Sequence, residues 1–100
     1  MSQTLTNAIQ GSVDYNNMKL KDILYNYPDQ PFVMLEGLDD AVVGVDQNFE
    51  RLVYSVEAII DLYIEQGMTH EEAIDYYGYT TARATPFIDN GPILVYLNFL

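Results

Sequence analysis

Apolar residues follow a helical period in the stretch from Ser55 to Tyr77, which we take as the centre of the fold. The first apolar positions recur at i, i+3, i+4 and i+7, and they are Val56, Ile59, Ile60 and Tyr63. This spacing lays one apolar stripe along a helix and argues against a strand. Ser55, directly before the stripe, is a residue type that caps helix starts. The pattern therefore predicts a helix that begins at Val56.

A stop signal and a second start signal follow this helix. Gly67 is suited to the left-handed conformation that closes many helices, and Met68 is placed to complete a Schellman motif. Thr69 and Glu72 have the spacing of a capping box, in which each side chain accepts a hydrogen bond from the other residue's backbone N–H. The sequence therefore predicts a helical hairpin, with helices over residues 56–66 and 70–77.

The other segments are short apolar runs separated by turns. Residues 1–14 are polar and irregular, and we interpret them as a flexible arm. Residues 15–27 fit a short helix that Pro28 must end. Four apolar runs are typical of strands, and they are Phe32 to Leu35, Ala41 to Val45, Arg51 to Tyr54 and Ile93 to Leu100. Gly44, inside one of these runs, predicts a bulge or a close backbone approach, and Gly78 predicts the end of the second hairpin helix.

These elements predict an α+β fold. The expected architecture is a small antiparallel sheet with the helix-turn-helix hairpin packed on one face. Residues 15–100 would form one domain, since a chain of 100 residues that is 49% hydrophobic suits a single core. The sequence has no Cys, no long apolar run and no secretory signal pattern. We therefore expect no disulfide, no membrane span and a cytoplasmic protein.

The chain is strongly acidic, with 15 Asp and Glu residues against 4 Lys and Arg and a net charge of −11. Proteins hold a phosphate backbone with clustered Lys and Arg, whereas the basic residues here are dispersed, at Lys19, Lys21, Arg51 and Arg83. We therefore expect neither direct nucleic-acid binding nor attachment to anionic membranes. Two interpretations of the charge stay open, a basic protein partner and a solvated surface that keeps the protein soluble.

Three segments in the second half of the chain carry a resemblance to a known group of proteins. They are AVVGVDQNF from Ala41, RLVYSVEAIID from Arg51 and GMTHEEAIDYYGY from Gly67, and a terminal apolar strand follows a Pro. Over residues 41–100 this succession resembles small uncharacterised accessory proteins of bacteriophages. The resemblance implies a phage-encoded accessory protein, located in the host cytoplasm, and implies no assigned activity.

Catalytic and metal-binding patterns are missing from the sequence. It has no Gly-rich phosphate loop, nucleophile elbow, HExxH motif or paired Cys. His70 precedes a group of acids, but Ile74 occupies the i+4 position at which a second helical ligand would stand. The acids are Glu71, Glu72 and Asp75, and the first two complement the dipole at the helix start. We therefore predict a non-enzymatic protein without catalytic, cofactor-binding or metal-ligating residues.

Acidic side chains form most of the predicted partner-binding surface. Glu57, Asp61 and Glu65 lie at i, i+4 and i+8, so they form one row along the first hairpin helix. Steps of about 6 Å along this row are wider than the roughly 3.4 Å between phosphates of one DNA strand. Imitation of a nucleic acid would need a second row, for which the available residues are Glu71, Glu72 and Asp75 or Asp39, Asp40 and Asp46.

Aromatic residues complete the predicted surface. Six tyrosines are candidates for an aromatic patch, and they are Tyr54, Tyr63, Tyr76, Tyr77, Tyr79 and Tyr96. Tyr63 and Tyr77 lie on the apolar stripes, which favours core packing. Tyr76 and Tyr79 are less constrained and are the better candidates for contact with a partner.

Two functions fit these features. In the first, the chain binds a basic host protein and inhibits or modulates it, as a nucleic-acid mimic or a plug. In the alternative, it is a structural or assembly accessory protein that self-associates, for example as a homodimer, through its aromatic surface and C-terminal strand. Salt should weaken the first interaction and leave the second unchanged or tighter.

Overall fold

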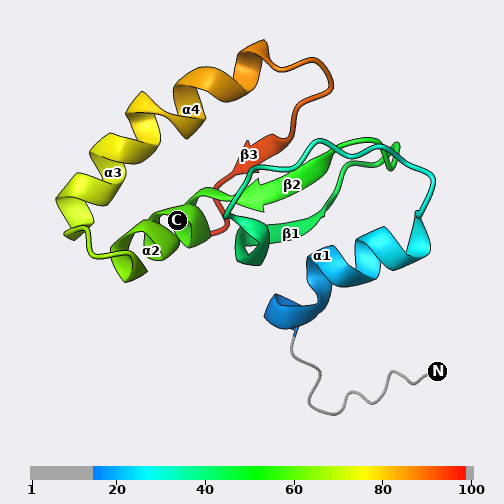
Figure 1. Cartoon of the computed structure of the whole chain (residues 1–100), viewed down its shortest axis with the longest axis horizontal. Coiled ribbons are helices and arrows are strands. Elements are labelled where there is room, and N and C mark those ends of the chain that lie inside the picture. Colours follow the sequence, from blue (N-terminus) through cyan, green and yellow to red (C-terminus); the bar gives the residue numbers. More distant parts are fainter. Residues whose placement is uncertain (1–14, 99–100) are drawn as a thin grey trace.

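The computed structural model describes residues 15–98, whose helices surround one small sheet (Figure 1). The helices are α1 (Tyr15–Asn26), α2 (Val56–Glu65), α3 (His70–Tyr79) and α4 (Thr81–Ala84), with short 3-10 helices η1 (Asp39–Ala41) and η2 (Thr85–Phe87). The strands are β1 (Val42–Val45), β2 (Leu52–Ser55) and β3 (Ile93–Val95). The predicted α+β class is confirmed. The predicted arm, residues 1–14, lies outside the described residues, as do Phe99 and Leu100 of the predicted last strand.

The sheet is mixed, with the strand order β1-β2-β3. Strands β1 and β2 pair antiparallel, and the register shift between Val42 and Gly44 places the predicted bulge. Strand β3 pairs parallel to β2, from Val53 opposite Ile93 to Ser55 opposite Val95. The prediction of a fully antiparallel sheet is therefore wrong at β3. Residues 56–92, with α2, α3 and α4, form the long helical crossover that a parallel pair requires.

The apolar run from Phe32 to Leu35 is not a strand, and this prediction is wrong. Phe32 is buried, as the apolar composition of this run led us to expect. The run does not, however, pair with any strand of the sheet. The backbone N–H of Leu35 instead donates to the Tyr54 hydroxyl at 2.8 Å. Tyr54 is fully buried, and this burial raises the pKa of its hydroxyl. The Tyr54 side chain thus supplies a hydrogen-bond acceptor for this backbone, as a neighbouring strand would do.

The helical hairpin is confirmed together with its caps. The Ser55 hydroxyl accepts the N–H of Ala58 at the start of α2. At its end, Gly67 has a φ of 112°, and the N–H of Met68 donates to the Tyr63 carbonyl, as in a Schellman motif. Both hydrogen bonds of the capping box between Thr69 and Glu72 are present at the start of α3.

One core joins the sheet to the hairpin. Its buried members come from β1, β2, α2, α3, η1 and the segment before η1, and they are Phe32, Leu38, Ala41, Val42, Leu52, Tyr54, Ile59, Tyr63 and Ala73. Leu20 and Ile23 of α1 pack against this core from the side of β1. Within residues 15–98 no helix has the length and apolar character that crossing a membrane requires.

Gly78 does not end α3, contrary to the prediction. The helix continues to Tyr79 and is followed at once by α4 and η2, so that residues 70–87 form one bent rod (Figure 1). The bend lies at Thr80, whose hydroxyl donates to the Tyr76 carbonyl at 2.7 Å. This rod carries much of the surface described next.

Candidate functional site

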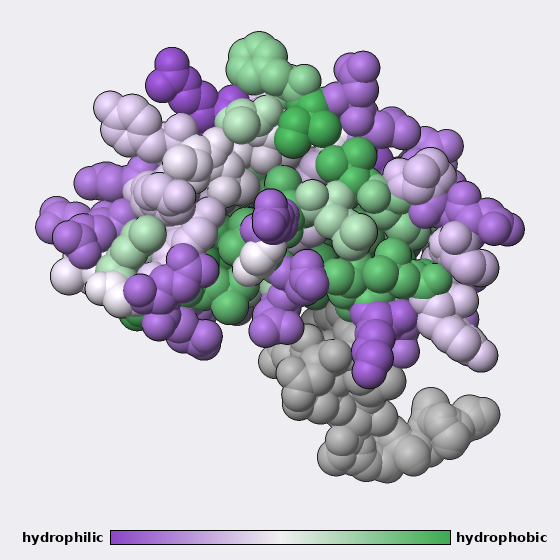
Figure 2. Space-filling view, in the orientation of Figure 1, coloured by the Kyte–Doolittle hydropathy of each residue, from purple (hydrophilic) through white to green (hydrophobic). Residues whose placement is uncertain are grey.

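Four exposed carboxylates lie on the outer sides of α2 and α3, and we call them the acidic face: Asp61, Glu65, Glu71 and Asp75. On α2 the acidic positions lie opposite the buried Ile59, and on α3 they lie opposite the buried Ala73, because each helix turns one stripe to the core. Figure 2 shows hydrophilic side chains at the end of the molecule that the α2–α3 turn forms, as along the rest of its outline. Asp61 and Glu65 are exposed, as their place in the predicted row requires.

Glu57 does not share this exposure, so the predicted three-residue row is wrong at its first position. Its carboxylate accepts the backbone N–H groups of Leu97 and Asn98 at distances from 2.8 to 3.1 Å, and the hydroxyl of Ser55 at 3.1 Å. These bonds to the charged form, those from Leu97 and Asn98 above all, lower the pKa of Glu57 from 4.5 to about 2. Glu57 is therefore a clamp that fastens the C-terminal segment to the start of α2.

Two other acids of the prediction, Glu72 and Asp46, also accept hydrogen bonds from the backbone of the chain. Glu72 accepts the N–H of Thr69 in the capping box, although its side chain is exposed. Asp46 accepts the N–H groups of Arg51 and Glu50 in the β1–β2 turn, and these bonds lower its pKa. The Oδ1 atom of Asp46 is thus engaged within the turn, and its side chain is less exposed than those of the acidic face. Asp39 and Asp40 are exposed and lie in η1, which contacts α2 but is not part of the helical hairpin.

Positive charge does little to offset the acidic face. Residues 52–82 contain no Lys or Arg. Arg51 is half-buried, and its Nε donates to the Gly91 carbonyl at 2.6 Å. Lys21 is exposed on α1, which packs on the β1 side of the sheet, whereas Arg83 is exposed on α4. Arg83 is thus the basic side chain nearest in sequence to the acidic face.

Tyr76 and Tyr79 are both exposed, as predicted, but they line different hollows. The Tyr76 ring meets the buried Tyr63 edge-on, with centroids 4.9 Å apart, and lines a hollow shared with Leu35. Tyr79 leaves 75% of its surface exposed. Tyr54 and Tyr63 are buried and Tyr77 is half-buried, which confirms core packing for the two stripe tyrosines.

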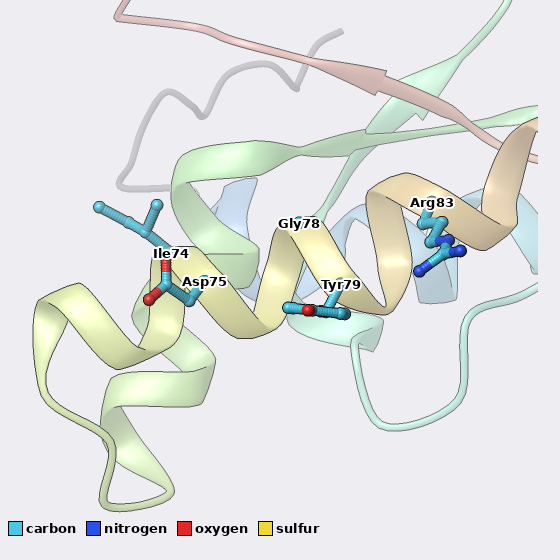
Figure 3. A pocket seen from close by; sticks show the side chains of 5 residues that line it. All are labelled: Ile74, Asp75, Gly78, Tyr79 and Arg83. Atoms are coloured by element: carbon cyan, nitrogen blue, oxygen red, sulfur yellow. The ribbon is translucent and has the colours of Figure 1, made fainter.

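Tyr79 borders an open hollow on the rod, lined by Ile74, Asp75, Gly78, Tyr79 and Arg83 (Figure 3). Asp75 and Tyr79 lie on the same side of the helix, and the backbone at Gly78 forms part of the floor. The sequence prediction included Asp75 and Tyr79 but missed the other three. The spacing of Asp75, Tyr79 and Arg83 at i, i+4 and i+8 was a usable signal, had Gly78 not been taken as a helix stop.

The described residues contain no group of three or more His, Asp or Glu side chains that could hold a metal ion. No protein-family model, curated protein or solved structure matches the chain.

Proposed function

We propose that this chain is a non-enzymatic accessory protein that binds a basic protein partner through the acidic face and modulates or inhibits it. The supporting observation is that Asp61, Glu65, Glu71 and Asp75 are exposed on neighbouring helices, in a stretch from residue 52 to residue 82 without Lys or Arg. A surface that served solubility alone would gain by interleaving opposite charges, which support helices at i, i+4 spacing.

Mimicry of a nucleic acid needs two rows of carboxylates, and the acidic face offers two acids on each of two neighbouring helices. Asp61 and Glu65 occupy one helix, and Glu71 and Asp75 occupy the next, each pair at i, i+4. Carboxylates so grouped raise the association rate of a basic partner and exclude acidic ones. The partner that fits is a basic, nucleic-acid-binding host protein, in keeping with the bacteriophage resemblance of residues 41–100.

The test combines capture with matched charge reversal. A partner captured from bacterial lysate is purified, and its affinity is measured for the parent protein and for two double variants. Asp61→Lys with Glu65→Lys alters the acidic face. Asp22→Lys with Asp29→Lys changes the net charge equally at exposed positions in and after α1.

We expect the first variant to lose affinity about tenfold or more, equal to about 1.4 kcal/mol, and the second to lose much less. Duplex DNA should compete with the parent protein for the partner. Equal losses for the two variants would show that overall charge, not the acidic face, carries the binding.

Self-association is a second candidate function, favoured by the position of β3. This strand is at one end of the sheet order, and the side chains of Tyr96 and Leu97, which follow it, are more than half exposed. An edge of this composition can pair with a second copy. Sedimentation across a range of salt concentrations tests this. A dimer that persists or tightens as salt rises supports it, whereas a monomer at every protein concentration rules it out.

A further inference from the structure

Gly78 occupies a helical position where nothing within the described structure requires a glycine. Gly67 needs its positive φ, and a Cβ on Gly91 would lie 2.9 Å from the Ile88 side chain. At Gly78 the φ is not positive, and an added Cβ would meet no atom within 4 Å. Glycine is a poor helix former, so its presence here weakens the helix without a packing gain. A glycine in such a position leaves the helix backbone open to the close approach of another molecule.

The lining of the hollow over Gly78 identifies the chemistry that would fit. Asp75 offers a carboxylate, Tyr79 offers an exposed ring, and Ile74 offers an apolar wall that is 44% exposed. A guanidinium can pair with a carboxylate and stack on an aromatic ring, while its hydrocarbon stem lies on apolar surface. The absent side chain at Gly78 leaves room for that stem.

The lining carries one acidic and one basic side chain, Asp75 and Arg83, so the preference for a cation comes from the neighbouring carboxylates. The hollow lies on α3, beside the acidic face, which attracts positive charge. Arg83 stands on the α4 side of the hollow and repels a cation there, so it directs an incoming guanidinium toward Asp75.

We propose that the hollow over Gly78 receives an arginine side chain of the basic partner, with the guanidinium at Asp75 and Tyr79 and the stem across Gly78. This inference rests on the proposed function and adds the residue type that the partner presents. The hollow would then bind one arginine specifically, whereas the acidic face attracts any basic side chain.

An oligoarginine peptide, titrated into isotopically labelled protein and followed by NMR, provides the probe. In the parent protein the largest shift changes should fall on residues 74–83. Gly78→Met fills the hollow with a good helix former and leaves every charge in place. It should weaken peptide binding roughly three- to tenfold, the range expected from losing a stacking contact and an exposed ion pair. Gly78→Ala, which adds one methyl group, is the control and should keep most of the affinity.

Two further titrations separate this inference from the proposed function. An oligolysine peptide of equal length should bind the parent protein more weakly than oligoarginine does. The Gly78→Met variant should bind the two peptides with equal affinity. Arg83→Gln should not weaken oligoarginine binding. If Gly78→Met binds like the parent while Asp61→Lys with Glu65→Lys loses affinity, the acidic face stands and the arginine pocket is refuted. Weakening by Arg83→Gln would contradict the repulsion between Arg83 and the bound guanidinium, which also refutes the arginine pocket.

Discussion

Replacing Tyr54 with Phe tests how β2 holds the segment from Phe32 to Leu35, which we call the crossing segment. The change removes one hydroxyl and keeps the ring, so it opens no sizeable cavity in a residue that is fully buried. The lost bond is the one that the Leu35 N–H donates at 2.8 Å. A donor left without a partner in a part-buried place costs about 1–3 kcal/mol. In a domain of this size each 1 kcal/mol lowers Tm by about 4–8 °C.

Urea denaturation followed by circular dichroism measures this loss. We expect a lower midpoint with an unchanged m-value, and faster hydrogen exchange at the Leu35 amide. Tyr25→Phe is the matched control, because Tyr25 is 84% exposed, and it should leave the midpoint unchanged. A Tyr54→Phe protein as stable as the parent would mean that water replaces the hydroxyl and that the crossing segment does not depend on this bond.

Three further predictions concern single contacts. Thr69→Ala should cost about 0.5–2 kcal/mol as a lost N-cap, and an unchanged thermal melt would remove the capping argument. Glu57 is stabilising in its charged form, because the backbone N–H groups of Leu97 and Asn98 hold its pKa at about 2 in the folded state, below 4.5. This contribution is present above pH 4.5 and is lost as the pH falls toward 2, so the stability difference between parent and Glu57→Gln should shrink over that range; a constant difference would contradict the clamp. Phe49 has a φ of 58°, so Phe49→Gly should be more stable than Phe49→Ala by about 1 kcal/mol, although both lose the stack on Tyr27; equal stabilities would contradict backbone strain at this turn.

The parts of the fold that local chemistry determines were predictable from the sequence. Ser55, Gly67 and the pair Thr69 and Glu72 act within one helical turn, and all their predicted caps are present. The direction of β3 was not recognised, although the long helical connection before it is the usual sign of a parallel pair. The segment from Phe32 to Leu35 could not be assigned, because its apolar pattern fits a strand and its partner is a tyrosine hydroxyl far along the chain.

The acidic face was predictable to the extent that helix periodicity decides exposure. Asp61 and Glu65 lie where the spacing puts them. Glu57 obeys the same spacing, yet its partners, the N–H groups of Leu97 and Asn98, are separated from it by about 40 positions and leave no local signal. Gly78 misled the prediction because glycine commonly ends helices. The structure places Gly78 inside α3, where it lines the hollow.

The salt dependence of partner affinity tests the central claim most directly. The dissociation constant of the captured partner is measured across a series of salt concentrations for the parent, the Asp61→Lys with Glu65→Lys variant and the Asp22→Lys with Asp29→Lys variant. We predict steep weakening with salt for the parent and the α1-side control, and a flat dependence with weak binding for the acidic-face variant. A salt dependence that is the same for all three proteins would contradict the role of the acidic face.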